Sequence, residues 1–394
     1  MTATASHTTP RAPAALPAGT PRVLFACGGT GGHVYPAIAI ADAIRSERPE
    51  VAIAFAGTRD RMEWEAVPKA GYPIHAVTVS GFQRGLSAEA LGRNLAFPFK
   101  LAKGFYESWR LVGAFDPDVV VGTGGYASGP VGLAGSLRRR PLALQEQNAY
   151  AGATNKLLAG RADVIFIAFE AARAYFPAAK CVLTGNPVRE ELLAARRDEA
   201  LAHFDIPATL PSGVAPRVLL VMGGSLGAGP LNGALKLHLA DVLADERAYV
   251  IWQTGSRYFD ALKAGVPAHP RLRLLPYLDR MDLAYAAADL AVCRAGAITC
   301  SELAATATPA VLVPSPNVTA DHQTKNARAL ADAGAALLLP EPELDTQFPV
   351  VVPPLLADVE RRLNMEEAAR QIARPHAARE IAARVLALAH QGAS

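Results

Sequence analysis

The residue of this sequence with the clearest potential for acid–base chemistry is His33, which directly follows the glycine run Gly28-Gly29-Thr30-Gly31-Gly32. An apolar segment with the composition of a buried β-strand, residues 23–27, precedes the run. Side chains at the carboxyl end of such a strand project into the crevice where α/β sheets bind ligands. An imidazole there can take a proton from an attacking hydroxyl, because its ordinary pKa lies near neutrality. The alternative is a histidine that only caps or packs the turn.

Two more glycine turns, residues 122–125 and 223–227, also lie between a predicted strand and a predicted helix. Backbone N–H groups in such a turn can approach an anion closely, and the helix N-terminus adds partial positive charge. A single turn of this kind is explained equally well by tight chain reversal. Three of them favour contact with phosphate groups.

The turns do not match two common nucleotide-binding fingerprints. The spacing G-x-G-x-x-G fails at Val34, and the second predicted strand ends in Gly57-Thr58 instead of an acidic residue that would bind ribose. No G-x-x-x-x-G-K-[ST] stretch is present either. The sequence therefore disfavours a nicotinamide-dependent dehydrogenase and a P-loop nucleotidase.

A second candidate site lies at residues 293–302, where a predicted strand leads into a helix. Glu302, one turn into that helix, can accept two hydrogen bonds from a ribose diol; its alternative role is ordinary charge stabilisation of a first helical turn. Arg189 follows the Asn186-Pro187 turn. It is a candidate phosphate clamp, or else a surface arginine.

No metal site or metal cofactor is predicted. The Asp116-Pro117-Asp118 stretch formally matches D-x-D, but it precedes a strand and has proline in the usual position of a turn. The four cysteines have no metal-like spacing and are expected to be reduced thiols of a cytosolic protein; they are Cys27, Cys181, Cys293 and Cys300.

The pattern of short apolar segments alternating with amphipathic ones predicts parallel βαβ units in two series. The first series of strands is expected at residues 23–27, 51–56, 75–79, 119–121, 142–145, 164–168 and 181–183. The second is expected at 218–222, 250–253, 272–275, 290–293, 310–313 and 336–339. The predicted fold is α/β, with two Rossmann-like domains whose parallel sheets face a deep cleft.

The length of 394 residues also exceeds one ordinary domain. We expect a tail at residues 1–20, an N-terminal domain at 21–186 and a C-terminal domain at 187–372; the family resemblance described below implies that the first binds the acceptor and the membrane and the second the UDP-sugar. Residues 373–394 are expected to form a helix that packs back toward the N-terminal domain.

Charge and hydropathy restrict the partners. A formal net charge of +3 gives no support for nucleic acid, and the uncharged stretches at 119–137 and 218–235 are broken by glycine and proline, unlike membrane spans. Residues 81–111 combine aromatic and basic side chains, which suits an anionic membrane surface. The alternative is that these aromatics are core residues.

Together these motifs resemble the MurG family, the UDP-N-acetylglucosamine transferases of peptidoglycan synthesis in the GT-B superfamily. The resemblance runs from about residue 21 to the C-terminus. It rests on the stretches at residues 28–36, 122–130, 146–149, 185–189 and 223–225, on 294–297 with Ser301 and Glu302, and on His322-Gln323 with Asn326. Leu226 and Ala295 depart from residues that are common in the family, which puts only fine diphosphate contacts in doubt.

The resemblance implies transfer of N-acetylglucosamine from its UDP donor to the C4 hydroxyl of the muramyl sugar of lipid I, with inversion, giving lipid II. It implies His33 as the base, with Glu146 as a second candidate for base or acceptor positioning. Uracil is expected near Leu278, ribose on Glu302, diphosphate near Ser225 and sugar hydroxyls near Gln323. The implied substrate contacts are Thr30, Gly31, Gly32, Tyr126, Asn148, Arg189, Ser225, Leu278, Ala297, Ile298, Thr299, Cys300, Ser301, Glu302 and Gln323.

The family also implies a peripheral position on the cytoplasmic face of the plasma membrane and protein partners in cell-wall synthesis. Two other readings stay open. One is another GT-B protein that shares the donor half, such as a diacylglycerol sugar transferase or a UDP-N-acetylglucosamine epimerase. The other is a catalytically inactive protein that only binds nucleotide sugar.

Overall fold

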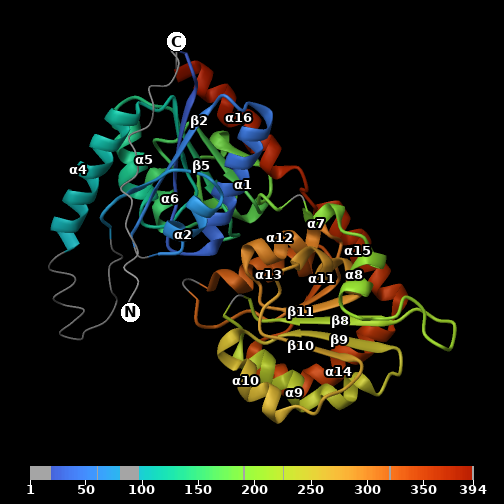
Figure 1. Cartoon of the computed structure of the whole chain (residues 1–394). Coiled ribbons are helices and arrows are strands. Elements are labelled where there is room, and N and C mark those ends of the chain that lie inside the picture. Colours follow the sequence, from blue (N-terminus) through green and yellow to red (C-terminus); the bar gives the residue numbers. More distant parts are fainter. Residues whose placement is uncertain are drawn as a thin grey trace, which may run out of the picture.

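The computed structural model describes residues 19–59, 61–79, 97–189, 191–224, 226–318 and 321–392. In this part of the chain, two all-parallel sheets form two lobes (Figure 1). Their strands are apolar on both faces, as expected for sheets covered by helices on either side. The α/β fold with two Rossmann-like units is therefore confirmed.

The N-terminal lobe is built on a seven-stranded sheet with the order β3-β2-β1-β4-β5-β6-β7. Its strands are β1 Arg22–Ala26, β2 Ala52–Gly57, β3 Ile74–Ala76, β4 Val119–Gly122, β5 Leu142–Glu146, β6 Val164–Ile167 and β7 Cys181–Leu183. Its helices are α1 Gly31–Glu47, α2 Glu63–Lys69, α4 Phe97–Phe115, α5 Ser128–Leu137 and α6 Ala153–Leu158, with 3-10 turns η1 Glu170–Tyr175 and η2 Ala178–Lys180.

The C-terminal lobe has a six-stranded sheet with the order β10-β9-β8-β11-β12-β13. Its strands are β8 Arg217–Met222, β9 Ala248–Gln253, β10 Leu272–Leu275, β11 Leu290–Cys293, β12 Ala310–Leu312 and β13 Ala336–Leu338. Its helices are α7 Glu191–Ala194, α8 Arg197–His203, α9 Gly229–Leu243, α10 Ser256–Gly265, α11 Met281–Ala287, α12 Ala297–Ala305, α13 His322–Asp332, α14 Leu344–Ala357 and α15 Val359–Ile372, with the 3-10 turn η4 Glu341–Glu343.

The last helix, α16 Ala377–Gly392, belongs spatially to the opposite lobe from α15 (Figure 1). It packs along α1 and buries Ile381, Val385 and Ala389 in the same core as Phe25 of β1. These three residues recur every four positions, so they share one face of the helix. The chain thus crosses between lobes twice, once after β7 and once after α15.

All thirteen strands fall where the sequence places them, with ends that differ by at most three residues. The largest difference is at β3, which ends at Ala76 instead of residue 79. Thr78 leaves the sheet because its N–H and hydroxyl donate to the carboxylate of Glu107 on α4, at 2.6 and 3.1 Å. Of the aromatic and basic segment 81–111, residues 81–96 lie outside the described part of the chain.

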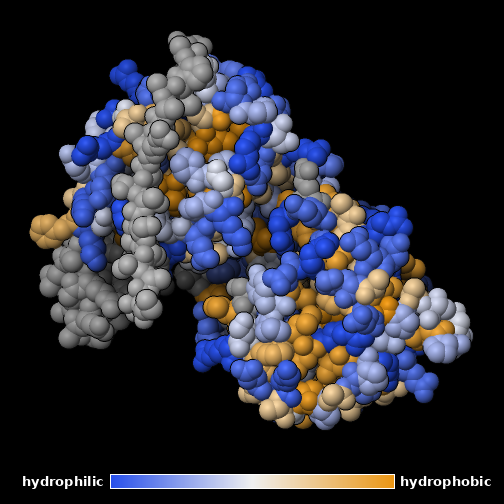
Figure 2. Space-filling model, viewed as in Figure 1, coloured by the Kyte–Doolittle hydropathy of each residue, from blue (hydrophilic) through white to orange (hydrophobic). Residues whose placement is uncertain are grey.

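Surface composition agrees with a folded two-lobe protein. In Figure 2, hydrophilic side chains cover much of the outer face of both lobes, and apolar ones show between them. Among the described residues, no helix is long and apolar enough to cross a membrane.

Candidate active site

Each sheet has one point where the strand order reverses, and ligands of α/β proteins bind beside such points at the carboxyl ends of the strands. In the N-terminal lobe it lies between β1 and β4, which are followed by the glycine turns at 27–30 and 123–127. In the C-terminal lobe it lies between β8 and β11, followed by residues 223–228 and 294–296. All the predicted glycine turns therefore lie at these two positions.

The two turns of the N-terminal lobe contact each other through their backbones. Gly124 and Gly125 both have positive φ, 97° and 81°. A Cβ on Gly125 would lie 2.1 Å from the carbonyl oxygen of Gly28, and a Cβ on Gly124 would lie 2.6 Å from Cδ2 of His33. Glycine is thus needed at both positions for conformation and for space.

His33 lies in the first turn of α1, beside the second glycine turn. Its Nδ1 is 3.0 Å from the hydroxyl of Thr30, and its backbone carbonyl accepts from the hydroxyl of Thr123 at 2.8 Å. Burial lowers the pKa of His33 to about 4, with a smaller contribution from His322 at the start of α13 in the other lobe. The imidazole is therefore neutral near pH 7, as a proton acceptor must be.

Two buried polar side chains hold these turns in shape: Glu63, which the sequence did not indicate, and Ser128, which belongs to the predicted stretch at residues 122–130. Glu63 is fully buried, and its carboxylate accepts from the N–H groups of Gly29 and Thr58, each at 3.0 Å. Ser128 is also fully buried; it accepts from the N–H of Gly124 and donates to carbonyl oxygens of β1 and the turn. Glu63 carries no local sequence signal, since a lone Glu on a helix is common.

Glu146 lies at the end of β5, where 1% of its surface is exposed. Its Oε1 accepts from the N–H of Asn148 at 3.1 Å, and its Oε2 accepts from the N–H of Gly152 and from Asn155 Nδ2, each at 2.9 Å. Burial raises its pKa, and these hydrogen bonds oppose the rise. Both oxygens are used in shaping the loop that carries Asn148, an arrangement suited to positioning.

The C-terminal lobe holds a formed cavity of about 160 Å³ next to its strand reversal. Glu302 of α12 lines it: Oε2 accepts from the hydroxyl of Tyr285 at 3.1 Å, and Oε1 lies 3.6 Å from Nη2 of Arg189. Burial raises the pKa of Glu302, and the charge of Arg189 opposes the rise. The lining residues are Met222, Gly224, Gln253, Tyr277, Leu278, Met281, Tyr285, Cys293, Arg294, Thr299 and Glu302.

The predicted donor residues on α12 do not all face this cavity. Thr299 and Glu302 line it, whereas Cys300 and Ser301 line a separate cavity of about 380 Å³ at the lobe boundary. Ala297 is buried and Ile298 is half-buried at the start of the helix. The backbone N–H groups in the first turn of α12 are therefore the groups of this segment that can face an anion.

Buried asparagines join the two half-sites. Asn186, between β7 and α7, donates to the hydroxyl of Ser301 at 2.9 Å and to the carbonyl of Gln147 at 3.0 Å. Asn326 of α13 accepts from the N–H of Ala149 at 2.9 Å and donates to Asn148 Oδ1 at 3.3 Å. The loop after β5 is thereby joined to helices α12 and α13 of the C-terminal lobe.

The remaining predicted residues lie around this junction. Thr30, Gly31 and Gly32 begin α1, and Tyr126 is exposed after the second glycine turn. Gln323 of α13 accepts from the N–H of Ser315 at 2.8 Å. Ser225 lies outside the described residues. Within the described ranges, no group of three or more His, Cys, Asp and Glu side chains is placed to hold a metal ion.

Comparison with known proteins covers both lobes. The glycosyltransferase family 28 N-terminal domain model matches residues 23–167, and the C-terminal domain model of that family matches residues 218–385. A relative from Salinibacter ruber (strain DSM 13855 / M31) is 56% identical over 94% of this chain and 97% of its own length. Its name is UDP-N-acetylglucosamine--N-acetylmuramyl-(pentapeptide) pyrophosphoryl-undecaprenol N-acetylglucosamine transferase.

Solved structures also match over both lobes. The crystal structure of Acinetobacter baumannii MurG matches with a TM-score of 0.72 at 32% identity, over 93% of this chain and 99% of that one. A UDP-GlcNAc 2-epimerase from Neisseria meningitidis, bound to UDP-GlcNAc, matches with a TM-score of 0.60 at 14% identity over 93% and 99%, which is a likeness of fold alone. The chain belongs to glycosyltransferase family 28 and, within it, to the MurG family of UDP-sugar-dependent hexosyltransferases with the GT-B fold.

Proposed function

We propose that this chain transfers N-acetylglucosamine from UDP-N-acetylglucosamine to the C4 hydroxyl of the muramyl sugar in undecaprenyl-diphospho-muramoyl-pentapeptide, forming lipid II. The observation that carries the proposal is identity to the Salinibacter ruber transferase of 56% over 94% of the chain, a span that includes both half-sites. The fold alone would not separate a transferase from an epimerase. The N-terminal lobe takes the acceptor, and the C-terminal lobe takes the nucleotide sugar.

In the acceptor half, His33 removes the proton of the attacking hydroxyl. Nδ1 lies 3.0 Å from the Thr30 hydroxyl, which can accept a hydrogen bond from Nδ1–H; in that tautomer Nε2 has the lone pair that takes the proton. The hydroxyl attacks C1 on the face opposite the diphosphate, so a single displacement inverts the anomeric centre. Glu146 acts as a positioning residue through Asn148, since its oxygens already accept the hydrogen bonds of that loop.

In the donor half, the cavity beside Glu302 takes the uridine, with the ribose on the carboxylate and the uracil near Leu278. The first-turn amides of α12 and the guanidinium of Arg189 stabilise the charge that grows on the departing UDP. UDP leaves already ionised, so the step requires no proton donor and no metal ion.

We further propose that the protein docks peripherally on the cytoplasmic face of the membrane through α4 and the segment before it. Exposed apolar side chains on α4 support this: Phe99 is 80% exposed, and Leu101 and Tyr106 are also exposed, beside the exposed Lys103 and Arg110. Aromatic and basic side chains together suit the interface of an anionic bilayer.

Cosedimentation with phosphatidylglycerol vesicles tests the docking surface. Phe99→Ser is expected to lower the bound fraction severalfold, because a large exposed side chain no longer inserts. The matched control is Tyr277→Ser, an exposed aromatic of the C-terminal lobe outside α4, which should bind the vesicles as the wild type does. Equal binding by the wild type and Phe99→Ser contradicts this surface.

The transferase itself is tested by UDP release from UDP-N-acetylglucosamine, with and without a lipid I analogue, in EDTA. We expect release that depends on the acceptor, resists the chelator and falls by about a hundredfold or more in His33→Ala, as for loss of a general base. UDP affinity should be unchanged in that variant, because His33 lies in the acceptor half. UDP release without acceptor, or none with it, would contradict the assignment and favour the epimerase or the binding protein.

A further inference from the structure

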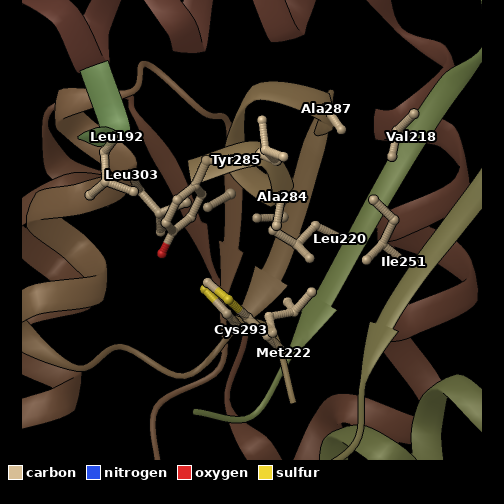
Figure 3. Close-up of a cluster of buried hydrophobic side chains, with 14 of the residues drawn as sticks. Leu192, Val218, Leu220, Met222, Ile251, Ala284, Tyr285, Ala287, Cys293 and Leu303 are labelled. Carbon is tan, nitrogen blue, oxygen red and sulfur yellow. The ribbon is translucent and has the colours of Figure 1, made fainter. Parts of the chain in front are cut away.

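Tyr285 lines the donor cavity from an unexpected position, inside the hydrophobic core of the C-terminal lobe. It lies on α11, 2% of its surface is exposed, and its ring packs in the cluster that also contains Leu220, Ile251 and Leu303. Figure 3 shows the ring among these side chains, with the hydroxyl oxygen pointing away from Ala284 and Ala287. That oxygen donates to Glu302 Oε2 at 3.1 Å.

We propose that Tyr285 is a positioning residue of the donor site, whose buried hydroxyl holds the Glu302 carboxylate in the orientation that accepts the ribose hydroxyls of a ribonucleoside diphosphate. The inference rests on the proposed function, because it assumes that the cavity binds UDP. In this proposal Tyr285 raises the affinity for the 2′ and 3′ hydroxyls through Glu302, without contacting the sugar itself.

The Glu302 carboxylate is held from two directions. Tyr285 reaches Oε2 from α11, and Arg189 approaches Oε1 from the segment that joins the lobes. Each carboxylate oxygen can accept two hydrogen bonds, so each retains one acceptor position for a ribose hydroxyl. A carboxylate already fixed in orientation loses less freedom when the diol binds, which raises affinity for the diol.

The energetics explain why this position has a hydroxyl. Packing among apolar neighbours needs only the ring, and burying a phenolic oxygen is unfavourable unless it forms a hydrogen bond. A hydrogen bond to an ionised group is stronger than one between neutral groups. The bond opposes the rise that burial causes in the pKa of Glu302, so it favours the charged form that accepts ribose hydroxyls.

Titration calorimetry with UDP and 2′,3′-dideoxy-UDP separates positioning from a purely structural role. We expect the wild type to bind UDP at least about tenfold more tightly than dideoxy-UDP, because losing one hydrogen bond to a charged group costs about that much affinity. Tyr285→Phe should lower the affinity for UDP by about tenfold and change the affinity for dideoxy-UDP by less than about twofold. The matched control is Tyr249→Phe, a buried tyrosine of the same cluster on β9 outside the cavity lining, which should bind both ligands as the wild type does.

Three outcomes decide the inference. The inference is overturned if Tyr285→Phe binds both ligands as the wild type does, or if it binds both more weakly by the same factor; UDP binding by the wild type then still supports the proposed function. A lower melting temperature with unchanged preference for UDP also overturns it, because the hydroxyl would then only stabilise the fold. A wild type that binds neither ligand overturns the proposed function and this inference with it.

Discussion

The two half-sites of this enzyme are built by different means. In the N-terminal lobe, two glycine turns contact each other through their backbones, with buried Glu63 and Ser128 holding their N–H groups. In the C-terminal lobe, a cavity is lined by side chains, and its charged group, Glu302, is held by Tyr285 and Arg189. Close glycine contacts occur in both halves, since a Cβ on Gly227 would lie 2.0 Å from the carbonyl oxygen of Thr254, but the donor half adds a cavity that depends on particular functional groups.

This difference indicates how each half responds to change. An added methyl group at Gly124 or Gly125 has no space, so its effect spreads to both N-terminal turns and to the fold. A change of functional group in the donor cavity leaves the backbone in place and alters only what the cavity binds. Substitutions at the crowded glycines should therefore mainly lower stability, and substitutions of the cavity side chains should mainly alter ligand selectivity.

The largest effect is expected for Gly125→Ala. The new Cβ would lie 2.1 Å from the Gly28 carbonyl oxygen, and φ is 81°, so steric overlap adds to backbone strain. We expect the melting temperature to fall clearly and acceptor-dependent turnover to fall with it, since both turns adjoin His33. The loss in free energy of unfolding should be about 3 kcal/mol or more.

Gly29→Ala is the matched control for that change. Gly29 is in the same lobe with φ of 92°, but a Cβ there meets nothing within 4 Å. Only the backbone cost of about 1–2 kcal/mol should remain. If the two variants have equal melting temperatures, the contact between the two turns does not determine the stability of this half.

Much of this architecture can be predicted from local pattern. Strands buried on both faces appear in the sequence as short apolar runs, so all thirteen were found, and the predicted glycine turns lie at the two strand reversals of the structure. Positive φ at Gly125 and Gly224 has the same local origin. His33 was found because it directly follows such a turn, and Glu302 because it lies in the helix that follows residues 294–296.

The contacts that orient the site were not predicted, because the partners in each contact are distant in sequence. Glu63 bonds a residue 34 positions away, Tyr285 one 17 positions away, and Asn326 one 177 positions away. Tyr285 also lies in a run of alanines that reads as core, which it is. A single sequence gives the identity of such a residue, but it does not show which distant residue the fold brings next to it.

The smallest effect is expected in the pH dependence of UDP affinity, and it sharpens the comparison between the halves. Burial raises the pKa of Glu302. As the pH falls from about 7, this carboxylate therefore takes up a proton at a higher pH than an exposed glutamate, whose pKa is about 4.3. Arg189, Tyr285 and Cys293 are the charged or titratable groups that interact with it. A protonated Glu302 loses acceptor capacity for ribose, so the Kd for UDP should rise by up to about tenfold per pH unit below that pKa.

His33 should not contribute to this dependence, because burial lowers its pKa to about 4 and it is already neutral over the range in which Glu302 titrates. Calorimetry of UDP binding should therefore give the same pH profile for the wild type and His33→Gln. Glu302→Gln should bind UDP more weakly and retain only the dependence that comes from the phosphate of UDP itself, which is common to all three proteins. A profile that changes in His33→Gln and persists in Glu302→Gln would mean that the acceptor half senses the nucleotide, and that the two half-sites are not divided in the way their construction implies.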